Sequence, residues 1–451
     1  MSKLNTCVNL RKTEHGFGIG NWGIAVVSLL GNKTFGIGAW DRTQPVAGRA
    51  MTGGLAALVL AVSSCASSSS PQSAPIVSED LLTQRQAVED YPASAQRFQA
   101  MDDVFPVARV KATPGDPLPI EVSPLPESVR LGDLQLGLTD ALTMTDTNAF
   151  LVIRDGALIH EAYFNGSNAE TQFIGWSISK SVTSLLFGIA LEEGDIASLD
   201  DVVEDYLPDM RGTAFEGVTL RNMLAMRAGT SYREQPMPDM PSHVDALVAQ
   251  SIFENRKRFT DLSEVDVATA AGQGETFNYS TLTASPLGRV IESATGMSLD
   301  DYTSEKLWKP AGMQDDAYWM LDGPEGVGDE WAGGGFNASA RDFARLGLMV
   351  LQGGNLNGLQ IVPQDWIDES IHDLGYGPVL PGAPRGYGYQ WWTFLNTNIS
   401  EAVGVHGQFI SIDPDTNTVI VKLSYWPERG SGKNAMMHHA LFTAIRTAVS
   451  D

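Results

Sequence analysis

Apolar residues are concentrated in short runs near both ends of the long segment that follows residue 145. Two such runs, 149–153 and 157–164, flank Asp155-Gly156, a pair that favours a tight hairpin turn. Near the C-terminus the same criterion predicts strands over 387–392, 403–412 and 418–423. The pattern therefore predicts strands contributed by both ends of one domain.

Helical spacing of apolar residues is found between these strands. Ser177 opens a segment whose apolar residues recur on one helical face until Gly194, a residue type that commonly ends helices. Further helices are predicted to begin near 218 and to cover about 287–294, 339–352 and 433–449. This order predicts an α+β fold: an antiparallel sheet flanked by terminal helices, with an inserted mainly helical subdomain.

Residues 231–275 lack a clear period. Proline and methionine gather at 236–241, and Arg256-Lys257-Arg258 forms a short basic run. We interpret the stretch as an irregular excursion that serves as a lid or a substrate-recognition segment.

The first 64 residues are expected to be a leader. Residues 53–62 are continuously apolar or small, too short to span a bilayer but suited to a secretory signal. They end in Val62-Ser63-Ser64-Cys65, which resembles a bacterial lipobox whose cysteine, Cys65, is lipidated and becomes the N-terminus. About fifty residues precede the apolar run, so we hypothesise a true start near Val46 or Met51. The alternative is an apolar helix inside a domain with an incidental cysteine.

Serines at 67–70 and Pro71 suggest that residues 65–110 form a flexible tether and lead-in. The remainder, 111–451, is expected to be one folded domain. A lipid on Cys65 would make the membrane a partner and would place the protein in the bacterial cell envelope, anchored in the periplasm.

Composition narrows the class of function. The 451 residues carry 30 Lys and Arg against 54 Asp and Glu, a formal net charge of −24, which excludes nucleic acid as an expected partner. The two cysteines, Cys7 and Cys65, both precede the folded part, so no disulfide is expected within it. Neither CxxC nor HExxH occurs, and we expect no metal or other cofactor.

Ser177 and Lys180 carry the candidate chemistry. Their i, i+3 spacing puts both side chains on one face at the start of a helix. A serine hydroxyl becomes a nucleophile when a base takes its proton, and a buried lysine with a lowered pKa can be that base. The free N–H groups of a helix N-terminus also suit a developing oxyanion. The spacing by itself is equally typical of a capping serine beside a surface lysine.

Tyr279, in Phe277-Asn278-Tyr279-Ser280, lies about a hundred residues after Lys180 and just before another predicted helix. The order Ser-x-x-Lys and then Tyr resembles the penicillin-recognising serine hydrolases, the family of class C β-lactamases and D,D-peptidases. Segments at 153–156, 198–201, 302–313, 333–336 and 386–389 resemble its esterase and amidase branch, with 6-aminohexanoate-dimer hydrolases as the nearest kind.

The resemblance covers roughly residues 145–449 and implies a serine hydrolase catalytic domain of the β-lactamase/D,D-peptidase-like fold. It implies that Tyr279 shares the general-base role with Lys180. The backbone N–H groups of Ser177 and Val405 would form the oxyanion hole, and Gly407 and Thr281 would contact a small ester or amide substrate. His406 is either a further substrate contact or a strand histidine whose ring is satisfied within the fold.

Two departures from the family pattern affect the substrate. Ala402-Val403-Gly404 stands where the family has Lys-Thr-Gly, and Thr281 stands where it has the asparagine of Tyr-x-Asn. Both weaken the expectation of β-lactam turnover. A β-lactamase or D,D-peptidase and a non-catalytic cell-envelope binding module remain the alternatives. An α/β-hydrolase is disfavoured because no G-x-S-x-G elbow occurs.

Overall fold

The computed structural model describes residues 77–450, apart from 122–124, 238–239, 264, 325, 381 and 431. The predicted leader, the lipobox with Cys65 and the first part of the predicted tether lie outside the described residues. All the described residues belong to one unit of the chain.

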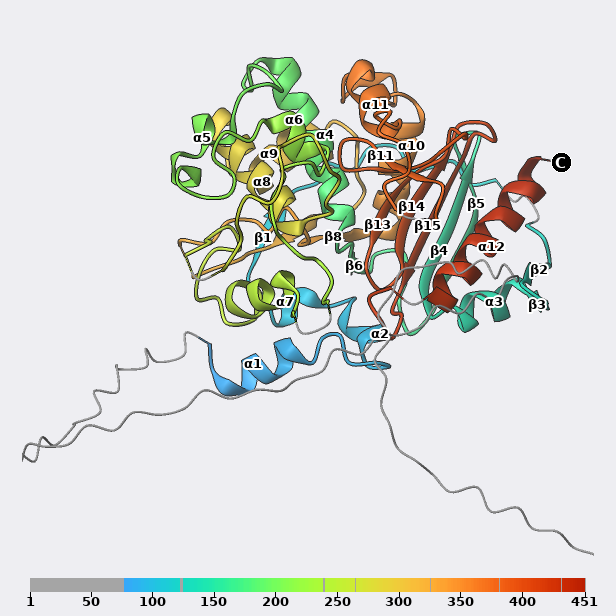
Figure 1. Cartoon of the computed structure of the whole chain (residues 1–451). Helices are drawn as coiled ribbons and strands as arrows, with labels where there is room; N and C mark the ends of the chain where they lie inside the picture. Colours follow the sequence, from blue (N-terminus) through green and yellow to red (C-terminus); the bar gives the residue numbers. More distant parts are fainter. Residues whose placement is uncertain are drawn as a thin grey trace, which may run out of the picture. The chain divides into compact units, whose positions relative to one another are not determined.

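A seven-stranded antiparallel sheet runs through the domain (Figure 1). Its order across the sheet begins at the C-terminal strands and ends with the hairpin of residues 147–163. In that order the strands are β11 (Arg385–Tyr387), β12 (Trp392–Phe394), β13 (Ser400–Gly404), β14 (Gln408–Asp413), β15 (Thr418–Ser424), β4 (Thr147–Arg154) and β5 (Ala157–Tyr163).

The pairing of β4 with β15 joins segments that are more than 260 residues apart, with Val152 opposite Ile420. The β4–β5 hairpin turns at Asp155 and Gly156, whose φ angles of 49° and 84° are those of the primed turn that an Asp-Gly pair favours. Both the hairpin and the assembly of the sheet from the two ends of the domain were predicted from the sequence, and both are confirmed.

Helices cover both faces of this sheet. The last helix, α12 (Gly432–Ser450), packs Leu441, Phe442 and Ile445 with sheet residues such as Phe150 in one buried cluster. On the other face lies α10 (Ala340–Leu351), where a side chain at Gly347 would collide with Val419. Figure 1 shows α12 on one side of the sheet, and the greater part of the helical residues on the other.

The inserted helical part carries the site. Its elements are α4 (Ile178–Glu193), α5 (Val203–Tyr206), η2 (Pro208–Met210), α6 (Leu220–Leu224), α7 (His243–Val248), η3 (Ala249–Phe253), α8 (Thr281–Thr295), α9 (Leu299–Tyr302) and η4 (Thr303–Trp308). After α10 comes α11 (Gln364–Ile371). Within the 231–275 excursion only α7 and η3 are helical, and most of the remaining described stretch is irregular, as predicted.

Helix α4 is buried along almost its whole length and not only on its apolar face. Its hydroxyls are satisfied internally: Ser181 donates to Gln390 O and Ser184 to Tyr389 O, both at 2.7 Å. Gly188 lies against the ring of Trp366, where a Cβ would be 2.2 Å from the nearest ring carbon. Gly194, with φ of 80°, ends the helix as predicted.

A second, four-stranded sheet supports the other side of the site. Its order is β1 (Val107–Val110), β7 (Ala317–Met320), β8 (Phe336–Ser339) and β6 (Gln172–Ile174). Two short hairpins complete the strands: β2 (Ser128–Leu131) with β3 (Leu134–Gly137), which leads into α3 (Leu138–Met144), and β9 (Asn355–Leu356) with β10 (Leu359–Gln360).

The segment before β1 departs from the expected tether. It forms α1 (Glu79–Gln86), α2 (Ser94–Arg97) and η1 (Met101–Asp103), and β1 then pairs with β7. Phe98, Met101 and Phe105 are buried in the main core. These short elements lack a clear period and could not be predicted from the sequence, because their stability comes from packing against distant residues. The folded unit therefore includes residues assigned to the tether and lead-in.

Two strand predictions were wrong in the same way. Residues 387–392 are not one strand: β11 ends at Tyr387, the chain turns, and β12 begins at Trp392. Residues 403–412 likewise contain a turn between β13 and β14, where His406 and Gly407 have φ of 59° and 85°. In both places a run of strand-forming residues hides a left-handed turn that only the pairing of neighbouring strands imposes.

Within the described residues no helix is both long and apolar enough to cross a membrane. The same residues contain no group of three or more His, Cys, Asp or Glu side chains arranged to hold a metal ion.

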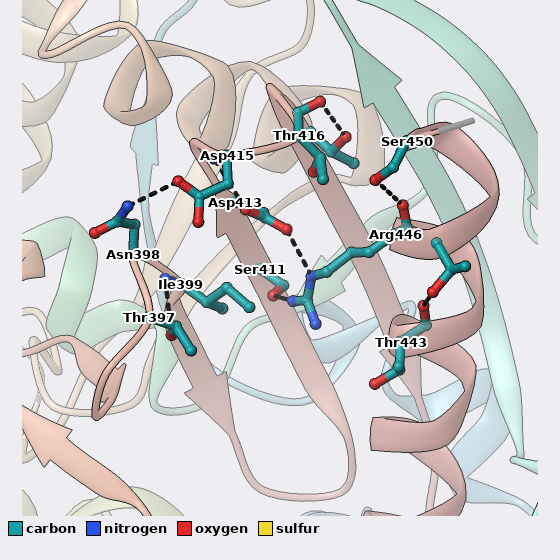
Figure 2. Close-up of polar contacts among 12 residues, drawn as sticks. Thr397, Asn398, Ile399, Ser411, Asp413, Asp415, Thr416, Thr443, Arg446 and Ser450 are labelled. Atoms are coloured by element: carbon teal, nitrogen blue, oxygen red, sulfur yellow. Dashed lines mark hydrogen bonds and ion pairs between the residues drawn. The ribbon is translucent and has the colours of Figure 1, made fainter.

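A buried ionic network fixes β13 between its neighbours and α12. Glu401 of β13 is fully buried and accepts hydrogen bonds from Arg385 and Ser411, each at 2.9 Å. Arg446 of α12 lies 3.8 Å from Glu401. Figure 2 shows Arg446 reaching down to Ser411 and Asp413 at the sheet. Burial alone would raise the pKa of Glu401, but the charges around it hold that pKa below its usual range.

We expect Glu401→Ala to lower the free energy of unfolding by about 3–5 kcal/mol, because it leaves buried arginines without their counter-charge. Chemical denaturation followed by circular dichroism measures this loss. Glu127→Ala, at an exposed position, is the matched control and should change the free energy by less than about 0.5 kcal/mol. Equal stability of the two variants would show that the network contributes nothing to β13.

Candidate active site

Ser177 lies at the N-terminus of α4, between the two sheets, and is half-buried. The preceding residue, Trp176, has a φ of 47°. This left-handed conformation is energetically unfavourable for a bulky residue. Its buried ring is held by edge-on contact with Phe98 at 5.5 Å and by Trp331 at 6.5 Å between ring centroids. This packing fixes the turn that presents the Ser177 hydroxyl.

Lys180 lies one turn further along α4 and is 1% exposed. Its Nζ is 2.8 Å from Ser177 Oγ, 3.0 Å from Thr281 Oγ1 and 2.6 Å from Gly333 O. Burial lowers the pKa of this amine to about 8, against a smaller opposing effect of the Glu234 carboxylate. A substantial fraction of Lys180 is therefore neutral near pH 8.

The partners of Lys180 determine where its lone pair points. Gly333 O can only accept, and Thr281 Oγ1 accepts from Lys180 because its own proton goes to Glu234 Oε1 at 2.6 Å. A neutral amine has two N–H bonds and one lone pair. With both N–H bonds committed, the lone pair faces the Ser177 hydroxyl, which is the arrangement that a general base requires.

Tyr279 comes from the segment just before α8 and completes the group. Its ring stacks on Trp392 at 5.3 Å, and Lys180 Nζ lies 5.2 Å from the ring centroid. Burial and the Glu234 charge raise the pKa of Tyr279 well above its usual range, although a hydrogen bond with Ser177 acts in the opposite direction. The phenol therefore keeps its proton at neutral pH and is suited to donate it.

The predicted oxyanion hole is assembled from two distant segments. Gly404, at the end of β13, is so close to the nucleophile turn that a Cβ there would be 2.2 Å from Gly175 O and 3.2 Å from Ser177 N. Val405 follows it and lines the same pocket as Ser177. Among the described residues, no acceptor takes a hydrogen bond from the N–H of Ser177 or of Val405. Both donors are thus available to a ligand.

A pocket opens beside Ser177. One part of its wall is apolar and comes from the N-terminal segment, the 231–275 excursion, β7 and the loop before β8: Phe105, Val244, Val248, Ile252, Met320 and Trp331. Charged residues also line it, among them Glu89, Glu234 and Arg429. The pocket suits a molecule with an apolar part and a few polar groups near the nucleophile.

Glu234 is the functional residue that sequence reasoning missed. Its carboxylate accepts from Thr281 N at 2.9 Å and from Thr281 Oγ1 at 2.6 Å. It thereby orients the hydroxyl that Lys180 uses. Glu234 belongs to the irregular 231–275 stretch, which offers no periodic pattern, so no local signal separated it from other acidic residues.

The expected substrate contacts do not all reach the pocket. Thr281 lines it, as expected. His406 is 2% exposed, with its ring against Phe98 behind the turn, and it is not among the residues that line the pocket. Gly407 faces Trp426, where a Cβ would be 2.4 Å from the ring. The left-handed turn at 406–407 directs both residues away from the pocket.

Comparison with known proteins identifies the family. The β-lactamase family model matches residues 144–442. The 6-aminohexanoate-dimer hydrolase of Paenarthrobacter ureafaciens is 30% identical over 357 residues, which covers 75% of this chain and 87% of that protein. The chain belongs to the β-lactamase family. It is a serine hydrolase of that family, as the resemblance predicted.

Solved structures support the fold assignment. A putative 6-aminohexanoate-dimer hydrolase from Bacillus anthracis superimposes with a TM-score of 0.72 at 26% identity, covering 80% of this chain and 96% of that one. A putative β-lactamase from Bacteroides dorei gives a TM-score of 0.53 at 20% identity, covering 69% and 97%. The predicted α+β, β-lactamase-like fold is confirmed.

We expect the rate of acylation to rise with pH and to level off above the pKa of Lys180, about 8, because only the neutral amine accepts a proton. In Glu234→Gln the loss of a negative charge favours the neutral amine, so the midpoint should move to lower pH. Stopped-flow measurement of acylation by a p-nitrophenyl ester between pH 6 and 10 gives both midpoints.

Glu121→Gln, at an exposed position, is the control for removing one negative charge and should leave the midpoint in place. A midpoint that moves to higher pH in Glu234→Gln would contradict the assignment of the limb to Lys180.

Proposed function

We propose that the protein cleaves an ester or amide bond of a small molecule through an acyl-enzyme on Ser177. The observation that carries this proposal is the 2.8 Å contact between Ser177 Oγ and the buried amine of Lys180. Because two relatives are named as 6-aminohexanoate-dimer hydrolases, amides are candidate substrates as well as esters.

Acylation begins when Ser177 Oγ attacks the substrate carbonyl and its proton passes to Lys180. The carbonyl oxygen becomes an oxyanion and accepts hydrogen bonds from the N–H groups of Ser177 and Val405. The bond to the leaving alcohol or amine then breaks. Tyr279 donates its proton to the leaving group and is reprotonated by Lys180, so that the acyl-enzyme forms with the base neutral again.

Deacylation repeats these steps with water. A water molecule attacks the ester carbonyl of the acyl-enzyme and gives its proton to the Lys180 and Tyr279 pair. The tetrahedral intermediate uses the same two N–H donors. Collapse expels Ser177 Oγ, which takes back a proton, and the carboxylic acid product leaves.

β-Lactam turnover is disfavoured by the charge of the pocket. Ala402, at the position of the family's lysine, is a fully buried, uncharged residue of β13. Glu234 adds a negative charge at the pocket wall, where its carboxylate accepts hydrogen bonds from Thr281. A ligand carboxylate near Ser177 would be repelled. We therefore propose neutral esters and amides as the substrates.

The test is hydrolysis of p-nitrophenyl acetate by the wild type and by Ser177→Ala, with nitrocefin and a small panel of amides in parallel. We expect ester turnover by the wild type and a loss of at least about a thousandfold in Ser177→Ala, because no other group replaces the nucleophile. Ser181→Ala, in the same helix, is the control for loss of a buried hydroxyl.

Equal activity of wild type and Ser177→Ala would show that another residue is the nucleophile. Failure of the wild type on every ester and amide would favour a non-catalytic binding module. Rapid nitrocefin turnover would favour a β-lactamase instead.

We also propose that the protein is exported and anchored in the bacterial cell envelope through a lipid on Cys65. Support comes from the apolar run 53–62 and the Val62-Ser63-Ser64-Cys65 motif, both in the part of the sequence that precedes the described residues. In a bacterial host, mass spectrometry of the membrane fraction should find a mature chain that begins at Cys65 and carries acyl groups.

Cys65→Ser should abolish this acylated species, whereas Cys7→Ser, which lies in the expected leader, should leave it intact. A mature chain that retains residues 1–50 would contradict the proposed anchor.

A further inference from the structure

The N-terminal segment places a carboxylate at the pocket. Glu89, three residues after the end of α1, accepts two hydrogen bonds of 3.0 Å from Arg429. Arg429 also donates to Asp245 of α7 at 2.7 Å. Burial would raise the pKa of Glu89, but hydrogen bonds from His406 and Arg429 outweigh it and lower the pKa to about 2. Glu89 is therefore charged at any physiological pH.

The same carboxylate faces the turn that follows β13. Nε2 of His406 lies 3.3 Å from Glu89 Oε2, while Nδ1 is 2.8 Å from the carbonyl of Trp426. A carbonyl accepts only, so Nδ1 is the donor in that contact, and Nε2 is the nitrogen that faces the Glu89 carboxylate. The imidazole is thus held at both of its nitrogens.

His406 is also held by its backbone, in a conformation that needs support. Its φ is 59°, a left-handed value that few residues other than glycine adopt without cost. Its N–H donates to Arg429 O at 3.3 Å, and its carbonyl accepts from Trp426 N at 3.1 Å. The residue immediately before it is Val405, whose N–H is free to bind an oxyanion.

A second contact links the N-terminal segment to both halves of the oxyanion hole. The ring of Phe98 lies 5.2 Å from the His406 ring and 5.5 Å from the Trp176 ring. Trp176 precedes Ser177 and His406 follows Val405. One aromatic ring of the N-terminal segment therefore packs against the neighbours of both N–H donors.

We propose that Glu89 is a positioning residue for acyl transfer, which acts through His406 to hold the turn that presents the Val405 N–H. This inference rests on the proposed function. It gives a role in acyl transfer to a segment that precedes residue 144, where the family match begins. An oxyanion donor contributes only while it is held in the right direction, so loosening the turn raises the barrier of both acylation and deacylation.

The test uses the full chain and four variants: Glu89→Gln, His406→Asn, the double variant and Asp90→Asn. Glutamine keeps the shape of Glu89 without its charge, and asparagine tolerates the left-handed backbone at 406. Asp90 is the matched control, since it is the adjacent acidic residue and pairs only loosely with Arg97, at 3.7 Å. Steady-state kinetics use p-nitrophenyl acetate, and phenylboronic acid serves as the oxyanion-mimicking inhibitor.

In Glu89→Gln we expect kcat and kcat/KM to fall together by about 10- to 100-fold, part of the effect of losing one oxyanion donor. The affinity for phenylboronic acid should fall by a similar factor, with KM changed by less than about twofold. Asp90→Asn should behave as the wild type. The double variant should be no less active than the less active of its two single variants, because both substitutions act on the same turn.

Three results would overturn the proposal: Glu89→Gln kinetics equal to those of Asp90→Asn, losses that multiply in the double variant, or a lower melting temperature with unchanged kcat and unchanged inhibitor affinity in the folded protein. Should Glu89→Gln fail to fold, His406→Asn alone decides, by the same kinetic and inhibitor measurements. An inactive wild type, or an active Ser177→Ala, would instead contradict the proposed function, and the inference with it.

Discussion

The buried amine of Lys180 is the constraint on which the rest of the site depends. At 1% exposure a permanent ammonium is costly, so the group must be able to lose its proton, and its neighbours must still satisfy its N–H bonds. Gly333 O and the Thr281 hydroxyl do so and leave the lone pair toward Ser177. Removing either partner would change the direction of the base as well as its pKa.

Satisfying this amine requires segments that are far apart in the chain to meet. Ser177 and Lys180 come from the N-terminal end of α4, Tyr279 and Thr281 from the segment that leads into and begins α8, and Gly333 from the loop before β8. The seven-stranded sheet contributes Val405 on the turn after β13, whose strand is fixed by the buried Glu401. Rigid packing on both faces of the sheet holds these residues, which come from separate loops and helix ends, at fixed positions relative to one another.

The candidate reactive residues could be proposed from the sequence because local rules apply to them. Ser177 and Lys180 share a helical face at any i, i+3 spacing, and Asp155-Gly156 selects its turn whatever surrounds it. The family pattern supplied Tyr279 and Val405 by their order along the chain. The sequence prediction joined β11 with β12 and β13 with β14 into single strands, because propensity alone does not show where a chain reverses direction.

By itself the sequence determined the fold class and both ends of α4, and it singled out Ser177 and Lys180 as the candidate nucleophile and base. These follow from periodicity, turn chemistry and motif order, which are local. Only the tertiary structure decided that Glu234 orients the Thr281 hydroxyl, that His406 lies behind the oxyanion turn, and that residues near Glu89 belong to the folded unit. Those facts depend on contacts between segments that are 47 to more than 300 residues apart in the chain, and burial, not sequence distance, sets the strength of such contacts.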